Sequence, residues 1–267
     1  MRLKTTECLN DFTGEHTVGE RKDCMNIIKE LLFPRRCPVC DGIIKIRVGN
    51  RKQGEKGWNK ICPQCMEKLI PVQEPWCLKC GKPLSEEPRE YCHDCSRGKH
   101  VFTRGRAVFT YDSVAASLYR FKYGERQEYA ECYGALAAEI LKDDTGLQQA
   151  QAMIPVPLHP ARLRKRGYNQ AALFARALGE AWGIPVYENL VVRCKNTQPL
   201  KQLNPTERQN NLKKAFKIVQ NDVKLNTILI VDDIYTTGST IDAVARVFSE
   251  AGVHTIYFVT LAVGKGF

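Results

Sequence analysis

The stretch ILIVDDIYTTGST, residues 228–240, decides the fold of this chain and its candidate site. Its first four residues form a continuous apolar run, which is typical of a central parallel strand covered on both faces. Asp232 and Asp233 follow at the expected strand end, where open α/β sheets place ligand groups. Five small residues then lead into a helical pattern that includes Phe248 and stops near Gly252.

The loop after the two acids suits a phosphate group. A helix N-terminus presents unpaired N–H groups and a positive dipole end, and small hydroxyl residues allow close approach and donate hydrogen bonds. The loop supplies these as Thr236, Thr237, Gly238, Ser239 and Thr240. Because carboxylates accept hydrogen bonds from vicinal hydroxyls, the string predicts a ribose 5-phosphate site. An ordinary strand end with a capping Asp would explain either half alone, but not the whole ordered string.

Length and composition narrow the class of protein. The chain has 267 residues and 43% hydrophobic content, enough for one large domain or a medium domain with a small one. The longest clear apolar run, residues 256–263, fits a strand, so we expect no transmembrane segment. The N-terminal residues lack an apolar signal core, and we therefore expect a cytoplasmic protein. In that compartment, 12 cysteines indicate metal binding rather than disulfides.

Eight of the cysteines fall in four CxxC pairs within sixty residues. This spacing lets two thiolates grip one ion, and four thiolates complete a tetrahedral zinc site. The pairs are Cys37 with Cys40, Cys62 with Cys65, Cys77 with Cys80, and Cys92 with Cys95. A redox interpretation fails because no βαβ pattern surrounds them. Closed sites of this kind are structural, and the segment is too poor in apolar residues to fold without metal.

The simplest arrangement binds two Zn²⁺ ions, one by the first two CxxC pairs and one by the last two. A crossed arrangement, first pair with third, stays open at this point. Each four-thiolate site adds two negative charges, so a net charge of +11 becomes about +7, still basic. We expect the other four cysteines to be buried thiols. These are Cys8, Cys24, Cys132 and Cys194.

Basic residues gather in the first half of the cysteine-rich segment, with tryptophans among or near them. This combination suits single-stranded DNA, whose bases stack on aromatic rings while its phosphates pair with cations. An alternative is a solvated scaffold whose tryptophans cover a small core, and both interpretations stay open. The residues are Arg35, Arg36, Lys45, Arg47, Arg51, Lys52, Lys56, Lys60, Trp58 and Trp76.

The chain divides into three predicted regions: a tail with a short amphipathic helix (1–33), a zinc-binding region (34–100) and an α/β domain (101–267). Within the last, alternating strand and helix patterns predict βα units. The expected strands are 102–111, 152–157, 186–192, 228–231 and 255–263, and the expected helices run from Ser113 to Gly124, from Tyr129 to Ile140 and from Asn169 to Trp182.

Two basic segments of this domain are candidate anion sites. Arg162, Arg164 and Arg166 are expected in a loop after the 152–157 strand, where paired charge-assisted hydrogen bonds would suit a pyrophosphate. Lys122, near the end of an expected helix, is a weaker candidate to face a phosphate. The long polar stretch 193–216 contains Arg193 and Arg208, and long insertions in compact domains are usually functional or mobile.

These residues carry a resemblance to a known family. VDDIYTTGST resembles the phosphoribosyl pyrophosphate (PRPP) motif of type I phosphoribosyltransferases. The PVPL…R…RGYNQ pattern at 155–170 and the R…TQ…L…R..N pattern from Arg193 to Asn211 resemble the ComF family of late-competence proteins. The resemblance implies a doubly wound, mostly parallel α/β sheet with a flexible hood at 193–216, preceded by a small double zinc ribbon with Cys₄ sites.

The same resemblance implies a function in DNA uptake during natural transformation. Asp232 and Asp233 would hold the ribose 2′- and 3′-hydroxyls as the catalytic residues of any transfer reaction. The segment from Thr236 to Thr240 would hold the 5-phosphate, and Tyr235 would be a further PRPP-binding residue. Mg²⁺ would enter with PRPP. Single-stranded DNA and competence or recombination proteins are the implied partners, at the inner face of the membrane. A phosphoribosyltransferase for an unidentified base or amine, and a PRPP sensor without turnover, stay open as alternatives.

Overall fold

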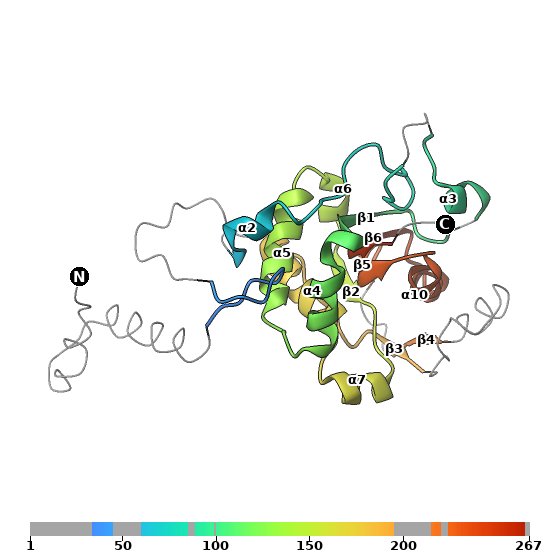
Figure 1. Ribbon diagram of the computed structural model, residues 1–267. Coiled ribbons are helices and arrows are strands. Elements are labelled where there is room, and N and C mark those ends of the chain that lie inside the picture. The colour runs from blue at the N-terminus through green and yellow to red at the C-terminus, as the bar shows by residue number, and fades with distance from the viewer. Residues whose placement is uncertain are drawn as a thin grey trace, which may run out of the picture.

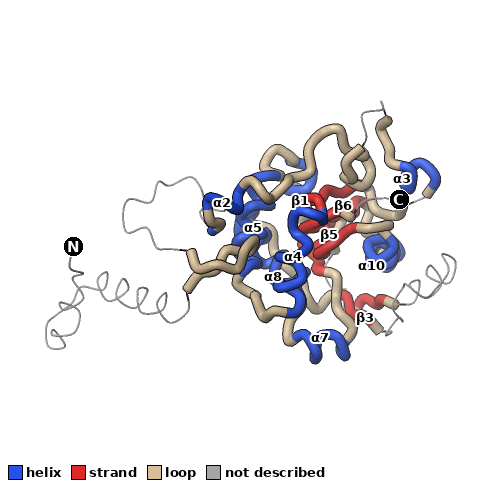
Figure 2. The backbone as a smooth tube through the Cα atoms, viewed as in Figure 1, coloured by secondary structure: helices blue, strands red, loops and turns tan. Residues whose placement is uncertain are grey.

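The computed structural model describes residues 34–44, 60–84, 89–98, 100–194, 215–219 and 224–264 (Figures 1 and 2). The helix expected before residue 34 lies outside these ranges, as does most of the 193–216 stretch. The boundaries expected near residues 34 and 101 remain predictions. Within the described residues, no helix has both the length and the apolar composition needed to cross a membrane.

A four-stranded parallel sheet forms the centre of the α/β domain, in the order β1-β6-β5-β2. Its central strand β5 pairs with β6 along one edge and with β2 along the other. Residues 228–231 are 0% exposed, which confirms the prediction from the apolar run. The strands are β1 (Arg104–Thr110), β2 (Ala152–Pro155), β5 (Thr227–Tyr235) and β6 (Thr255–Val263).

Helices cover both faces of this sheet (Figure 1). Leu229 and Val231 pack in one apolar cluster with residues of α4, α5 and α8, while Ile228 and Ile230 pack in a second cluster with α10. This is the doubly wound arrangement that the sequence predicts. The helices are α4 (Tyr111–Tyr123), α5 (Tyr129–Ile140), α6 (Thr145–Gln148), α7 (Pro160–Arg166), α8 (Gln170–Trp182) and α10 (Ser239–Glu250).

Two smaller parts accompany the main sheet. Strands β3 (Val191–Arg193) and β4 (Phe216–Ile218) form a separate antiparallel pair at the two ends of the expected hood. Residue 186 only bridges to Met153, so the strand expected over 186–192 is mostly irregular. The cysteine-rich region contains the short helices α2 (Pro63–Met66) and α3 (His93–Arg97).

The central strand is longer than the apolar run indicated. β5 continues through both acids to Tyr235, because β6 keeps pairing with it as far as Val263. On the other side, pairing with β2 stops at Val231. Asp232 and Asp233 therefore lie inside one ladder but beyond the carboxyl end of the neighbouring strand, where the prediction placed them.

Two helix predictions need correction. Arg162, Arg164 and Arg166 are not in a loop but on α7, which Pro160 begins and Gly167 ends with a positive φ of 83°. The His159 ring accepts a hydrogen bond from the Ala161 N–H at this helix start. The α4 helix begins at Tyr111, before the predicted cap Ser113, whose hydroxyl instead donates to the Thr110 carbonyl.

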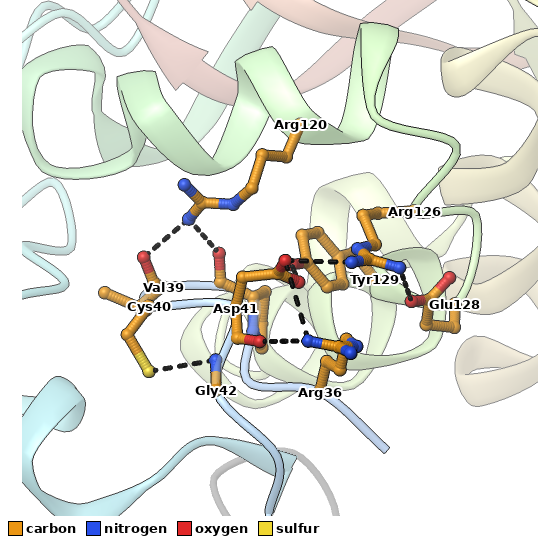
Figure 3. Close-up of polar contacts among 10 residues, drawn as sticks. Arg36, Val39, Cys40, Asp41, Gly42, Arg120, Arg126, Glu128 and Tyr129 are labelled. Carbon is orange, nitrogen blue, oxygen red and sulfur yellow. Dashed lines mark hydrogen bonds and ion pairs between the residues drawn. The ribbon is translucent and has the colours of Figure 1, made fainter. Parts of the chain in front are cut away.

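The turn that carries the first CxxC pair, residues 37–42, is called here the first zinc knuckle. It docks on α4 and on the segment that leads into α5 through polar contacts (Figure 3). Asp41 accepts hydrogen bonds from Arg126 Nη2 at 2.9 Å and from the Tyr129 hydroxyl at 2.5 Å. Arg120 Nη2 donates to the carbonyls of Pro38 and Val39, at 3.1 and 2.6 Å. The knuckle thus offers its acceptors to cations of the α/β domain, a contact that the sequence did not indicate.

The charge of Asp41 favours this docking. Partial burial by itself would raise the pKa of the Asp41 carboxyl, but the hydrogen bonds from Arg126 and Tyr129 lower it below its ordinary value. A lowered carboxyl pKa adds stability above the unfolded pKa, and that stability is lost as the pH falls through the folded value. The contact therefore weakens in acid.

We expect Asp41→Ala to lower the free energy of unfolding by about 1–3 kcal/mol, because it leaves Arg126 and Tyr129 without their shared acceptor. Glu131→Ala is the matched control, since Lys60 and Glu131 also join the ribbon to α5 but Glu131 is 76% exposed. Urea denaturation at pH 7 measures both changes. Equal, near-zero effects of the two substitutions would refute the docking role of Asp41.

Candidate functional site

The two acids of β5 form the centre of the candidate site. Both are partly buried, and the Asp233 N–H donates to Asp232 Oδ1 at 2.8 Å. Lys122, near the end of α4, places its Nζ 2.7 Å from Asp233 Oδ2. The sequence placed Lys122 close to a phosphate, whereas the structure pairs it with the acid that would hold the ribose.

The pKa of Asp232, one acid of the pair, is strongly raised. Burial, and then the neighbouring negative charge of Asp233, raise the pKa of Asp232 to about 8. The Asp233 N–H and the Lys122 cation act in the opposite direction but do not outweigh them. A cation or a set of hydroxyl donors at this position would therefore lower the free energy needed to ionise Asp232. Carboxyl groups with such perturbed pKa values are a feature of binding sites.

The loop after the acids is shaped for close approach of an anion. Gly238 has a φ of 79°, and a Cβ there would lie 2.7 Å from the Tyr235 hydroxyl, so only glycine fits. No side chain caps the start of the 12-residue helix α10 that follows. The hydroxyls of Thr237 and Ser239 lie 2.9 Å apart at this uncapped start. Free N–H groups and hydroxyls together suit a phosphate.

Two arginines from different elements act on the same region. Burial, and then the positive charge of Arg162 on α7, lower the pKa of Arg193 on β3, while the negative charge of Asp232 opposes this. Arg193 is therefore within electrostatic range of both Arg162 and Asp232. Two cations in this region would favour the binding of a further anion, such as a pyrophosphate.

Other predicted site residues are not brought to the acid pair. The Tyr235 ring is 1% exposed and stacks on Phe258 with centroids 4.8 Å apart, so its side chain belongs to the core. Arg164 is exposed on α7, and Arg166 Nη1 donates to the side-chain Oε1 of Gln170 at 2.6 Å. Arg208 lies outside the described residues.

The eight CxxC cysteines form two clusters, and the pairing is the successive one. Within each cluster the four Sγ atoms lie within 4.8 Å of one another, a donor set that fits a tetrahedral Zn²⁺. This removes the crossed arrangement. Cys132 is buried as expected, but Cys194 is exposed, so the prediction of a buried thiol there was wrong. The clusters are Cys37, Cys40, Cys62 and Cys65, and Cys77, Cys80, Cys92 and Cys95.

Residues 100 and 101, at the end of the zinc-binding region, contact the first turn of α10, which follows the phosphate loop. His100 Nδ1 lies 2.6 Å from Asp242 Oδ2, and the Val101 N–H donates to Asp242 Oδ1 at 2.9 Å. The His100 ring also stacks on Phe102. The sequence did not indicate the contact between His100 and Asp242, because no local pattern links residues so far apart.

The fold and the clusters define a class of protein: a double zinc ribbon joined to a phosphoribosyltransferase-type α/β domain. Residues 28–96 match the double zinc ribbon domain family, and residues 170–266 match the phosphoribosyl transferase domain family. "Competence protein F" of Haemophilus influenzae is 30% identical over 231 residues, which are 84% of this chain and 95% of that protein. The chain therefore belongs to the competence protein F, or ComF, family.

Further relatives share most of their length with this chain. "Competence protein ComFC" of Bacillus subtilis is 29% identical, covering 72% of this chain and 79% of that protein. "DNA utilization protein YhgH" of Salmonella typhimurium is 28% identical, covering 82% and 86%. A purine phosphoribosyltransferase structure from Pyrococcus horikoshii aligns with 49% of this chain and 70% of its own at 19% identity and a TM-score of 0.29. The family assignment therefore rests on sequence.

Zinc stoichiometry tests the two clusters. We expect about two Zn²⁺ per purified chain and about one in Cys80→Ser, because three thiolates hold a structural ion much less tightly. Cys194→Ser is the matched control, since that thiol is exposed and outside both clusters. Elemental analysis by mass spectrometry measures the metal. Unchanged zinc in Cys80→Ser would remove that residue from the site.

The raised pKa of Asp232 predicts a pH effect on stability. The native acid keeps its proton up to about pH 8, whereas the unfolded one loses it near its ordinary value, so stability falls as the pH rises between the two. Asp232→Asn should therefore gain stability over the wild type, by more than about 1 kcal/mol at pH 8.5 but little at pH 4.5. Denaturant unfolding across pH, with exposed Asp143→Asn as control, measures this. Parallel wild-type and Asp232→Asn curves would contradict it.

Proposed function

We propose that this protein binds PRPP, or another ribose 5-phosphate ligand, at the carboxyl edge of β5 and acts in the handling of DNA during uptake. The observation that carries the first part is the meeting of three features at one sheet edge. These are the acid pair Asp232 and Asp233, the uncapped start of α10, and the cations Arg162 and Arg193. Each suits a different part of the ligand.

We assign the parts of the ligand as follows. Asp232 and Asp233 accept hydrogen bonds from the ribose 2′- and 3′-hydroxyls, and Lys122 holds Asp233 in place through their ion pair. The hydroxyls and N–H groups of residues 236–240 hold the 5-phosphate. Arg162 and Arg193 face the pyrophosphate, with Arg164, Arg166 and Arg208 as further predicted contacts of that group.

Mg²⁺ fits this assignment by its donor chemistry. The acid pair supplies carboxylate oxygens, the ligand type that Mg²⁺ prefers, and the pyrophosphate would supply the rest. When bound, the ion neutralises charge on the pyrophosphate. The chain's own residues hold the ribose through the acid pair and the 5-phosphate through residues 236–240, at the opposite end of the ribose from the pyrophosphate.

The role in DNA handling rests on the relatives. Two are described as competence proteins and others as DNA utilization proteins, and this chain covers most of the length of each that we name. We extend the proposal to the cytoplasmic face of the membrane, with competence or recombination proteins as partners. Two four-thiolate sites support a reducing compartment, where thiols are not lost to disulfides. We also keep residues 34–100 and 101–267 as the two functional units.

Calorimetric titration of PRPP with Mg²⁺ tests the ligand site. We expect binding to the wild type and at least about 10-fold weaker binding to Asp233→Ala, because the ribose hydroxyls lose an ionised acceptor. Asp143→Ala is the matched control, as an exposed acid beyond α5. Equal affinity of Asp233→Ala and wild type would remove the site assignment. Pyrophosphate release in the same samples separates a transferase from a protein that only binds.

A further inference from the structure

The exposed face of α4 carries two aromatic side chains that are largely open to solvent in the described protein. Tyr119 and Tyr123 are 67% and 58% exposed, among the most exposed large side chains in the described residues. They lie one helical turn apart, with ring centroids separated by 5.2 Å. Exposed aromatic pairs of this kind cost solvation energy and are typical of binding surfaces.

Basic side chains of α7 adjoin these rings. The Arg166 guanidinium lies over the Tyr123 ring, 4.9 Å from its centroid, and Arg166 Nη2 donates to the Tyr123 hydroxyl at 3.1 Å. Arg166 also donates to Gln170, so two partners fix the guanidinium in place. Arg162, Arg164 and Lys165 are exposed on the same short helix, which carries no acidic residue. The figures show α7 next to the end of α4 that bears Tyr123 (Figures 1 and 2).

We propose that Tyr119, Tyr123 and Arg166 form a stacking platform for single-stranded DNA, with the cations of α7 pairing with its phosphates. Two adjacent exposed rings beside a guanidinium suit unpaired bases, whose flat faces a duplex hides. Adjacent cations suit a polyanion and not an apolar partner. The proposal rests on the role in DNA handling proposed above, and it specifies the surface that performs it.

The position of the platform relates it to the ligand site. Tyr123 follows Lys122, which contacts Asp233, and Arg162 belongs to both regions. A DNA strand on the platform would therefore pass beside the sugar phosphate site. Of the described candidates for DNA contact in the ribbon, Trp76 is only partly exposed and its ring centre lies 3.4 Å from the Arg106 guanidinium, while Arg36 donates to the Asp41 carbonyl.

Fluorescence anisotropy with a labelled oligothymidylate of about 20 nucleotides tests the platform on the full-length, zinc-loaded protein. We expect Tyr119→Ala and Tyr123→Ala each to weaken binding at least about 5-fold, and both together about 30-fold, because each removes one stacking surface. Tyr119→Phe and Tyr123→Phe should bind within about 2-fold of the wild type. Tyr91→Ala, which truncates an exposed aromatic on the ribbon, is the matched control.

Further binding measurements decide the proposal. A duplex of the same length should bind more weakly, and Lys165→Ala should flatten the salt dependence of oligothymidylate binding by about 0.7 in logarithmic slope. Equal affinity of the double alanine variant and the wild type would overturn the platform, as would equal competition by polyglutamate, which offers charge without bases. An oligonucleotide that fails to bind the wild type would do the same.

A parallel PRPP titration separates this proposal from the one before it. Tyr119 is 67% exposed and packs on Tyr123, so Tyr119→Ala should bind PRPP as the wild type does while losing DNA affinity. Absence of PRPP binding in the wild type, with the tyrosine effects intact, would count against the ligand site alone. Normal PRPP binding with no tyrosine effect on DNA would count against the platform alone.

Discussion

The unequal pairing of β5 is the constraint on which the rest of the structure depends. One side of the strand follows β6 as far as Tyr235, whereas the other side loses β2 after Val231. The ladder with β6 keeps Asp232 and Asp233 in extended, fixed backbone, and the end of β2 opens the space beside them. Apolar residues buried on both faces hold the strand in that register, because a shift by one residue would exchange its two faces.

Helices and a strand next to the carboxyl end of β5 supply the rest of the candidate site. Helix α4 brings Lys122 to Asp233, β3 and α7 bring two arginines, and α10 begins with an uncapped turn. The same α4 also holds the first zinc knuckle through Arg120 and displays two tyrosines to solvent. One helix thus contacts the zinc ribbon and the acid pair and carries part of the proposed DNA surface.

The zinc ribbon shares an apolar core with the α/β domain. Its buried residues Cys37, Ile61 and Leu69 belong to the same apolar cluster as α4, α5 and α8. Near the second metal cluster, Lys82 lies over the Tyr235 ring, and the Gly81 backbone approaches β1 too closely for any side chain. Metal binding at both clusters would therefore stabilise not only the ribbon but also the sheet edge that carries the ligand loop.

The sequence by itself determined what is local. The apolar run at 228–231, the acids and the small loop that follow it, and the CxxC spacing each depend on neighbouring residues, so the central strand, the phosphate loop and two four-cysteine sites could be predicted. Their order along the chain also indicated a doubly wound fold. The family patterns at 155–170 are likewise contiguous, although the sequence mistook α7 for a loop because its basic residues have no apolar periodicity.

Only the tertiary structure decided which distant residues meet. Three contacts join residues that no local pattern connects: the Lys122–Asp233 ion pair, the docking of Asp41 on Arg126, and the His100–Asp242 contact. The exposure of Tyr119 likewise depends on how the helices pack. Tyr235 looked like a ligand residue within its motif, but core packing against Phe258 turned it inward. The physical reason is that pairing across a fold depends on the register of strands and the packing of helix faces, which pattern and spacing leave undetermined.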